Sequence, residues 1–134
     1  MHGLGLAGVV VSFVLAALPA HAGGDPAKGE KVFRYCLACH RIGPGAGTLV
    51  GPELNGVVGR HSGSVPDYPY SEANKKSGLT WDEPTLTRYL AAPQTVVPGT
   101  RMTFAGLKKD EDIANVIAYL KTFDATGNPV KPAE

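Results

Sequence analysis

The chain has 134 residues, a formal net charge of +1, 43% hydrophobic residues and 19% charged residues. These values are ordinary for one globular domain, and they exclude a disordered chain and a protein that coats nucleic acid. All 13 basic and all 12 acidic residues lie after residue 22, so the beginning of the chain differs from the rest.

The first 22 residues have the pattern of a secretory signal peptide. An apolar run from Val9 to Leu18 is followed by a proline and by the small-residue sequence Ala20-His21-Ala22, which is typical of a cleavage site. We predict that residues 1–22 are removed and that residues 23–134 form one periplasmic domain without stable membrane insertion. No Lys or Arg precedes the run, and an uncleaved anchor is the alternative. The uncharged segment from Gly3 to Ala20 is short for a membrane span.

The first predicted helix begins at Asp25-Pro26, where an N-capping side chain precedes proline at the first helical position. Apolar residues lead from it into Cys36-Leu37-Ala38-Cys39-His40, which contains the only two cysteines. Two thiols three positions apart lie on one side of a helical turn and can add to the two vinyl groups of one haem. The following histidine can bind the iron. The motif predicts one covalent haem c, attached through Cys36 and Cys39, with His40 as proximal iron ligand.

Three other interpretations of this motif account for it less well. A disulfide between Cys36 and Cys39 would close a very short loop and leave His40 without a role. A zinc site usually needs a second ligand pair, and the other three histidines are isolated from one another in the sequence. A thioredoxin-like redox pair would follow a strand in a βαβ pattern, whereas this motif closes a helical stretch.

The rest of the chain predicts helices joined by long loops. Segment 42–69 is rich in glycine and proline and has no sustained period, which indicates loops wrapped around a rigid group. Helices are predicted over 71–77, from a capping box that starts at Thr80 to about Pro93, and over about 110–123. Because no useful stretch has the two-residue period of a strand, the predicted fold is all-α, with short helices and long loops.

The second axial position decides what a haem of this kind can do, because an open iron site takes up small ligands and a closed one only exchanges electrons. After signal removal Met102 is the only methionine, and it lies in the turn-rich segment 98–104. A lone methionine is otherwise often a core residue. His61, in a segment between two glycines, is the competing candidate. We predict Met102 as the second ligand, and therefore a relatively high reduction potential.

With these residues in place, the chain from residue 24 to residue 123 resembles class I cytochrome c, in particular the small bacterial periplasmic members close to the mitochondrial type. The resemblance implies the class I fold around one covalent haem and a soluble one-electron carrier rather than an enzyme. It rests on motifs in the family's order: Gly24-Asp25, 29–33, 36–40, 51–56, Gly59-Arg60, 68–70, Asn74, Ser77-Gly78, Trp81, Tyr89-Leu90, 98–102, 104–107 and 117–121.

The resemblance also implies roles for other residues. Pro52 lies where the family places the carbonyl that accepts the ring N–H of the proximal histidine. Residues that match contacts of the haem propionates are Arg60, Tyr70 and Trp81, and for Trp81 core packing is true at the same time. A buried polar cluster near the methionine is matched by Asn74, Tyr89 and Thr100. The contact between the first and last helices is matched by Gly29 and Phe33 with Tyr119 and Leu120.

As partners, the resemblance implies a quinol:cytochrome c oxidoreductase, a terminal oxidase, a photosynthetic reaction centre or a periplasmic dehydrogenase, and as assembly state it implies a monomer. Segment 41–50 holds one basic residue where many members have lysines, so weak electrostatic steering is expected. Segment 93–104 has no lysine that could displace Met102 at high pH. Two alternative functions are open. One is a haem enzyme or gas-binding protein with a vacant sixth iron site, and the other is a subunit of a larger redox complex.

Overall fold

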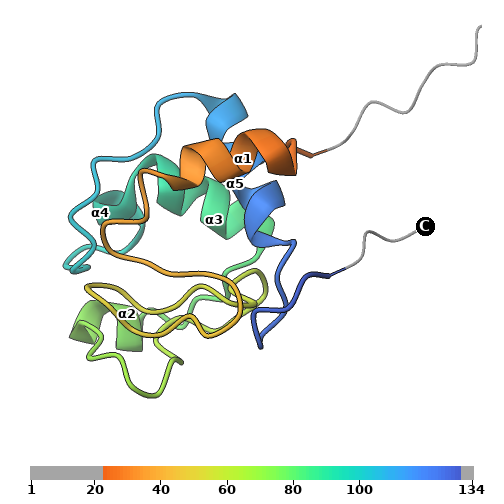
Figure 1. Ribbon diagram of the computed structural model, residues 1–134. Coiled ribbons are helices and arrows are strands. Elements are labelled where there is room, and N and C mark those ends of the chain that lie inside the picture. The colour runs from red at the N-terminus through yellow and green to blue at the C-terminus, as the bar shows by residue number, and fades with distance from the viewer. Residues whose placement is uncertain (1–22, 131–134) are drawn as a thin grey trace, which may run out of the picture.

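The computed structural model describes residues 23–130, which contain five helices (Figure 1). The helices are α1 (Pro26–Phe33), α2 (Glu72–Lys76), α3 (Glu83–Ala91), α4 (Pro93–Val96) and α5 (Asp110–Leu120). The only extended pairing in this range is two isolated bridges, His61 with Thr80 and Phe123 with Pro129. None of these helices is long and apolar enough to cross a membrane. The predicted signal peptide lies outside the described residues.

Three helices begin at side chains that cap them. Asp25, Ser71 and Asp82 accept hydrogen bonds from N–H groups in the first turns of α1, α2 and α3. Such a cap supplies an acceptor to an N–H that has no partner inside the helix. The helix predicted from Thr80 therefore begins later, at Glu83, because Asp82 and not Thr80 is its N-cap.

The other helix ends also differ from the predictions. Helix α1 ends at Phe33, and the cysteines follow in tight turns, the first of which bonds Cys36 N to Phe33 O at 2.8 Å. Helix α3 ends at Ala91, and Pro93 begins the separate short helix α4, because proline lacks the N–H that would continue α3. Helix α5 ends at Leu120, three residues earlier than predicted.

Helices α1 and α5 cross closely (Figure 1). A Cβ at Gly29 would lie 2.6 Å from Asn115 C and 2.8 Å from Tyr119 Cβ, so only glycine permits this approach. The Phe33 and Tyr119 rings pack with centroids 5.4 Å apart. The buried Asn115 side chain accepts a hydrogen bond from Asp25 N at 2.8 Å, which ties the start of α1 to α5. The predicted contact between the first and last helices is therefore present.

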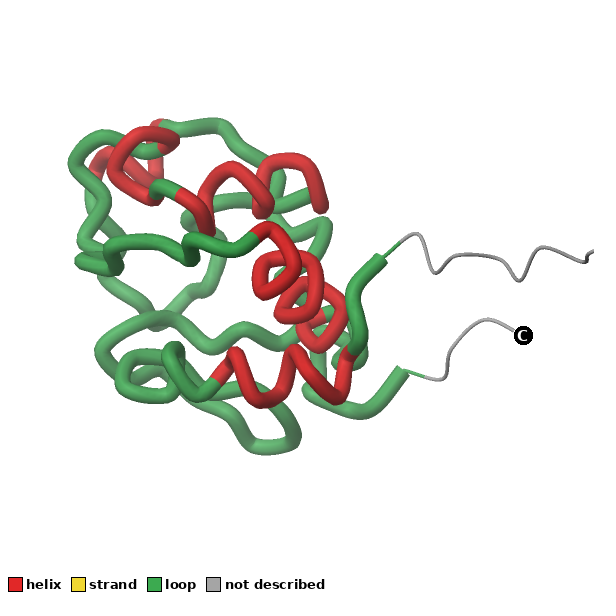
Figure 2. The backbone as a smooth tube through the Cα atoms, turned by 90° about the horizontal axis from the view of Figure 1, so that it is seen from above, coloured by secondary structure: helices red, strands yellow, loops and turns green. Residues whose placement is uncertain are grey.

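The molecule has a helical half and a half built mainly of loops. Figure 1 shows α1, α3, α4 and α5 in the upper half, and α2 with the loops from residue 40 to residue 82 in the lower half. Loops also make up most of the backbone seen from above (Figure 2). The buried apolar core includes Leu86, Ile113, Val116 and Ile117, all from α3 and α5. The space between the two halves positions the site described next.

Candidate functional site

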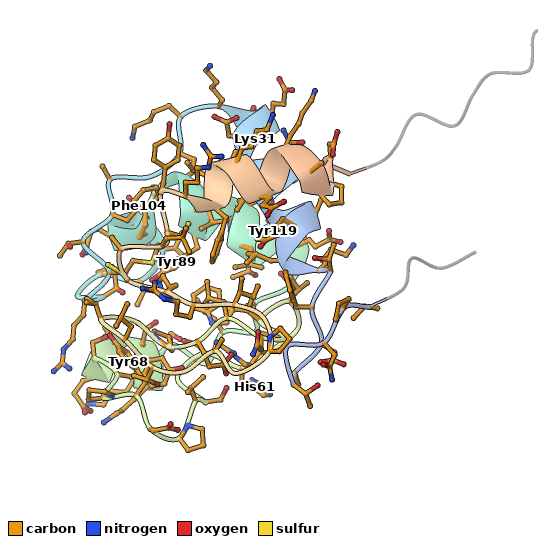
Figure 3. The ribbon with its side chains drawn as sticks, in the orientation of Figure 1. Lys31, His61, Tyr68, Tyr89, Phe104 and Tyr119 are labelled. Carbon is orange, nitrogen blue, oxygen red and sulfur yellow. The ribbon has the colours of Figure 1, made fainter. Side chains whose placement is uncertain are left out.

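A cavity of about 240 Å³ lies between the helical half and the loop half. Its wall includes Phe33, Leu86 and Leu120 from the helices and Leu54 and Val57 from the loops. Tyr68 and Tyr89 come from opposite halves of the molecule (Figure 3) and both line this cavity. The result is a mostly apolar chamber that two separate parts of the chain have to close.

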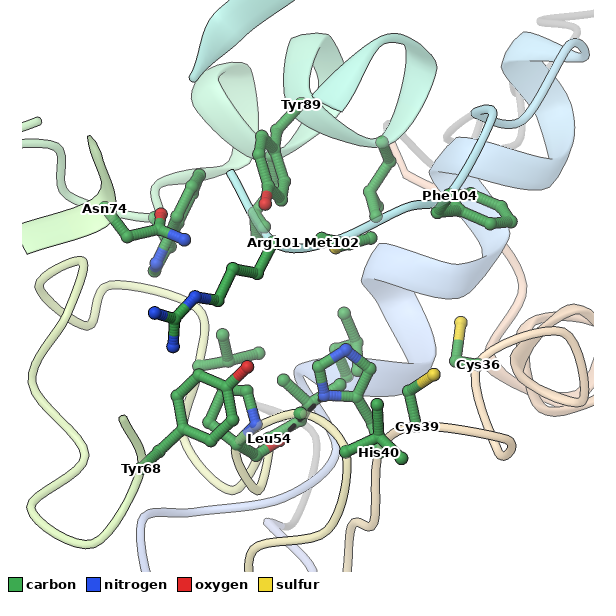
Figure 4. Close-up of a pocket in the computed structure, with 18 of the residues that line it drawn as sticks. Cys36, Cys39, His40, Leu54, Tyr68, Asn74, Tyr89, Arg101, Met102 and Phe104 are labelled. Atoms are coloured by element: carbon green, nitrogen blue, oxygen red, sulfur yellow. Dashed lines mark hydrogen bonds between the residues drawn. The ribbon is translucent and has the colours of Figure 1, made fainter. Parts of the chain in front are cut away.

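The cysteine motif forms one edge of the cavity (Figure 4). Cys39 N and His40 N both donate to Cys36 O, at 3.1 and 2.9 Å, so the motif follows a tight helical turn. Both cysteines are free and half-buried. Burial raises the pKa of the Cys36 thiol to about 11, and the neighbouring Cys39 adds to the rise. A thiol that stays protonated at neutral pH is a poor redox nucleophile, so the thioredoxin-like interpretation gains no support.

The disulfide and zinc interpretations gain no support either. The two sulfur atoms are not bonded to one another. Within residues 23–130, no group of three or more His, Cys, Asp or Glu side chains could hold a metal ion.

The His40 ring is held in one orientation at the floor of the cavity. Its Nδ1 lies 2.7 Å from Pro52 O, so the ring donates to this carbonyl and leaves Nε2 free with its lone pair. A Cβ at Gly51 would lie 2.8 Å from Nδ1 and overlap the ring, so the backbone can pass here only as glycine. Burial lowers the pKa of His40, the Pro52 carbonyl acts in the opposite direction, and the Arg60 charge lowers the pKa further. The neutral ring is the form that binds a metal.

Met102 lies on the opposite wall from His40 (Figure 4). Thr100 Oγ1 accepts from Met102 N at 3.3 Å and from Asn74 Nδ2 at 3.3 Å, and it shares a hydrogen bond with the Tyr89 hydroxyl at 3.1 Å. The cluster predicted near the methionine is therefore assembled around Thr100. Burial raises the pKa of Tyr89, whereas its hydrogen bonds with Thr100 and Asn74 act in the opposite direction.

His61 is exposed and lies away from the cavity. Its backbone pairs with Thr80, and its Nδ1 lies 3.4 Å from Thr80 Oγ1. It is not among the residues that line the cavity, so the structure does not bring this competing candidate to the site.

Arg60, Tyr70 and Trp81 all line the cavity. Tyr70 Oη accepts from Val65 N at 3.1 Å. Burial raises the pKa of Tyr70, the Val65 N–H and the Arg60 charge lower it, and the Glu53 charge raises it. Trp81 is also part of the core, because it is buried and its ring packs 4.6 Å from that of Tyr89.

The structure adds contacts that sequence reasoning missed. Glu53 forms an ion pair with Arg60 at 3.2 Å. Gln94 Nε2 donates to Thr100 O at 3.1 Å and to Met102 O at 3.3 Å. Arg101 extends from the Met102 loop and donates to Pro69 O at 2.6 Å. These pairs lie in loops or join a loop to another segment, so no periodic pattern in the sequence marks them.

The donors in this cavity fit a covalent haem. Two thiols stand at one edge, an imidazole and a thioether face each other across the space, and the lining is mainly apolar (Figure 4). The Arg60 side chain borders the cavity, and a haem carboxylate would match its positive charge.

Comparison with known proteins gives consistent matches. The family model described as Cytochrome c matches residues 26–124. The chain is 51% identical over 117 residues to cytochrome c2 of Blastochloris viridis, covering 87% of this chain and 92% of the relative. It is 56% identical over 105 residues to cytochrome c2 of Rhodoblastus acidophilus, covering 78% and 98%. Cytochrome cH from Methylobacterium extorquens is a similar solved structure, with a TM-score of 0.70, 48% identity and coverage of 74% of this chain and 99% of that chain.

Proposed function

Because the chain belongs to the cytochrome c family, it is an electron carrier with one covalent haem c, and we propose that Cys36, Cys39, His40 and Met102 bind that haem. The predicted all-α class I fold and the predicted haem c are confirmed by this membership. When bound, the haem supplies a one-electron couple between Fe(III) and Fe(II).

Each proposed ligand has a distinct task. The thiols of Cys36 and Cys39 anchor the haem edge covalently. His40 presents Nε2 as one axial ligand, because its Nδ1 is committed to Pro52 O. Met102 supplies the thioether on the other side. The observation that carries this proposal is that His40 and Met102 face one another across a single cavity with both thiols at its edge.

The polar residues around the cavity hold these groups in place. We assign Arg60, Tyr70 and Trp81 to the haem propionates, since all three line the cavity and carry donors. Asn74, Tyr89 and Thr100 support the methionine side through their mutual hydrogen bonds. The apolar walls keep water away from the haem, and solvent exposure is one of the factors that set its reduction potential.

We propose that the protein acts as a carrier and not as an enzyme, because His40 and Met102 together would leave the iron no open position. Carbon monoxide tests this directly. The reduced wild-type protein should bind no carbon monoxide at neutral pH, and Met102→Ala should bind it readily, as seen in the Soret spectrum. Thr95→Ala, at an exposed position that does not line the cavity, is the control and should behave as wild type. Binding by the wild-type protein would support the alternative of a haem enzyme or gas-binding protein.

We propose that the mature protein is periplasmic and begins at Gly23. Fractionation of cells followed by N-terminal sequencing checks both points. A full-length protein in the membrane fraction would support the uncleaved anchor instead. Elution of the native protein as a monomer in size-exclusion chromatography would count against a permanent place in a larger complex.

We propose that its redox partners dock mainly through apolar contacts near Cys36. Tyr35 and Val50 line the cavity edge and are 70% and 67% exposed. Leu37 and Leu49, close to them in sequence, are 44% and 46% exposed. A quinol:cytochrome c oxidoreductase as electron donor fits this proposal, with a terminal oxidase or a photosynthetic reaction centre as acceptor. A periplasmic dehydrogenase is a further candidate donor.

A further inference from the structure

Arg60, on the loop wall of the cavity, forms an ion pair with Glu53 that the proposed function leaves unexplained. Glu53 Oε1 lies 3.2 Å from Arg60 Nη1, and the two side chains are 21% and 17% exposed. In each of the other ion pairs found within residues 23–130, both side chains are at least 49% exposed. Exposed pairs contribute little, whereas a charge pair that is mostly buried has to be matched closely by its surroundings.

Segment 53–55 holds the Arg60 guanidinium through both terminal nitrogens. Nη1 donates to Glu53 Oε1 at 3.2 Å and to Asn55 O at 3.1 Å, and Nη2 donates to Glu53 O at 2.9 Å. Glu53 is itself fixed, because its Oε2 accepts from Asn55 N at 2.5 Å. The guanidinium therefore cannot turn without breaking several charge-assisted hydrogen bonds.

The Arg60 side chain also lines the cavity. Its Nη2 carries two N–H groups, and the structure gives this nitrogen one hydrogen bond, to Glu53 O. Under the proposed function the second N–H donates to a haem carboxylate.

The charges of Glu53 and Arg60 act in opposite directions on a group of the cavity wall. Tyr70, which lines the cavity, has a pKa that the Arg60 charge lowers and the Glu53 charge raises. The oxidised haem carries one more positive charge than the reduced haem. A fixed negative charge nearby therefore favours the oxidised form, and a positive charge favours the reduced form.

We propose that Glu53 is a positioning residue for the haem, which holds Arg60 against a haem carboxylate and lowers the reduction potential by offsetting the Arg60 charge. The inference rests on the proposed function. In this proposal the Glu53–Arg60 pair helps to set the reduction potential of the carrier.

The test is the reduction potential of the Glu53→Gln holoprotein. Glutamine keeps the size and an acceptor oxygen but removes the charge. We expect the electron-exchange equilibrium with a fixed one-electron mediator to shift at least threefold toward the reduced protein, which is about 28 mV at 59 mV per tenfold. An unchanged potential in a variant with a normal haem spectrum would overturn the proposal.

Glu72→Gln is the matched control. Glu72 also pairs with a cation, Lys75 at 3.3 Å, but it is 70% exposed and, unlike Arg60, its partner does not line the cavity. Its potential should match that of wild type. The Glu53→Gln shift should also persist from 10 mM to 500 mM salt, because a partly buried charge is screened less than an exposed one. A shift that disappears with salt would mark Glu53 as an ordinary surface charge and overturn the proposal.

Glu53→Asp separates the effect of the charge from the effect of packing. It also replaces Glu53→Gln as the test if that variant accumulates no holoprotein. Aspartate keeps the charge but shortens the reach to Arg60. We expect lower thermal stability and a shift in reduction potential less than half that of Glu53→Gln. If only Glu53→Asp yields holoprotein, its electron-exchange equilibrium constant with the same mediator should lie within about 1.5-fold of the wild-type value. A larger shift would show that packing and not charge sets the potential. Absence of haem from the wild-type protein would instead refute the proposed function.

Discussion

The two walls of the haem cavity are held in different ways. On the His40 wall, the ring is fixed by the partly buried bond to Pro52 O and by close packing against Gly51. On the Met102 wall, the ligand lies on a loop whose hydrogen bonds converge on Thr100 and on the exposed Gln94. A ligand fixed by packing and backbone moves only if the fold opens, whereas a loop can open locally. Ligand exchange should therefore begin at the Met102 wall.

The largest effect is expected where the His40 wall leaves no space. In Gly51→Ala the new methyl group would overlap the His40 ring. We expect either no accumulation of holoprotein or a loss of about 3 kcal/mol in the free energy of unfolding, measured by urea titration of the Soret band. Gly47→Ala is the control, because a Cβ there would meet nothing within 4 Å. Equal stability of the two variants would contradict a tightly packed His40 wall.

A smaller effect is expected at the centre of the Met102 wall. Thr100→Val keeps the shape but removes the acceptor shared by Asn74, Tyr89 and Met102 N. We expect a loss of about 2 kcal/mol in unfolding free energy, because buried polar groups lose their partner. The absorbance band of the Met-bound oxidised haem should also disappear at lower pH than in wild type. Thr95→Val, at an exposed position of α4, should change neither quantity.

The hydrogen bonds of Gln94 allow a finer test of the same loop. Gln94→Ala removes the donor to Thr100 O and Met102 O. We expect a cost of about 0.5 to 1 kcal/mol and a pH of methionine displacement lowered by less than one unit, measured by spectroscopic titration. Because segment 93–104 has no lysine, the replacing ligand should be hydroxide or a lysine outside it, such as Lys75 or Lys108. If the pH midpoint of methionine displacement is the same in Gln94→Ala as in wild type, the loop is held in place without Gln94.

The smallest effect concerns salt. If docking is mainly apolar, the rate of electron transfer to a purified redox partner should fall less than about twofold between 10 and 200 mM salt. Val50→Lys should slow transfer about threefold by disturbing the docking surface, whereas Val130→Lys, at another exposed valine, should not. A steep loss of wild-type rate with added salt would point to charge-driven docking.

The haem motif and the helix caps could be predicted from residues close together in sequence, and Met102 was predicted as a ligand because it is the only methionine after the predicted signal peptide. The contacts between loops could not be predicted in this way. The haem motif and the caps at Asp25 and Ser71 act over a few residues, so their chemistry can be read from local spacing. The predicted start of α3 was wrong, because Thr80 and Asp82 both fit a capping role and only the backbone conformation decides between them. The roles of Pro52 and Thr100 were inferred through the family resemblance, not through spacing.

The sequence alone determined the cofactor and an all-α fold with long loops, and it predicted Cys36 and Cys39 as the covalent anchors, because thioether attachment and helix capping depend on neighbours within one or two turns. Only the tertiary structure decided which polar groups face the haem cavity. The bond from His40 to Pro52, the Glu53–Arg60 pair and the contact of Gln94 with the Met102 loop all arise from loops folded around a shared space. Such contacts leave no periodic signal, because loop residues meet according to how the whole chain packs and not according to their separation in sequence.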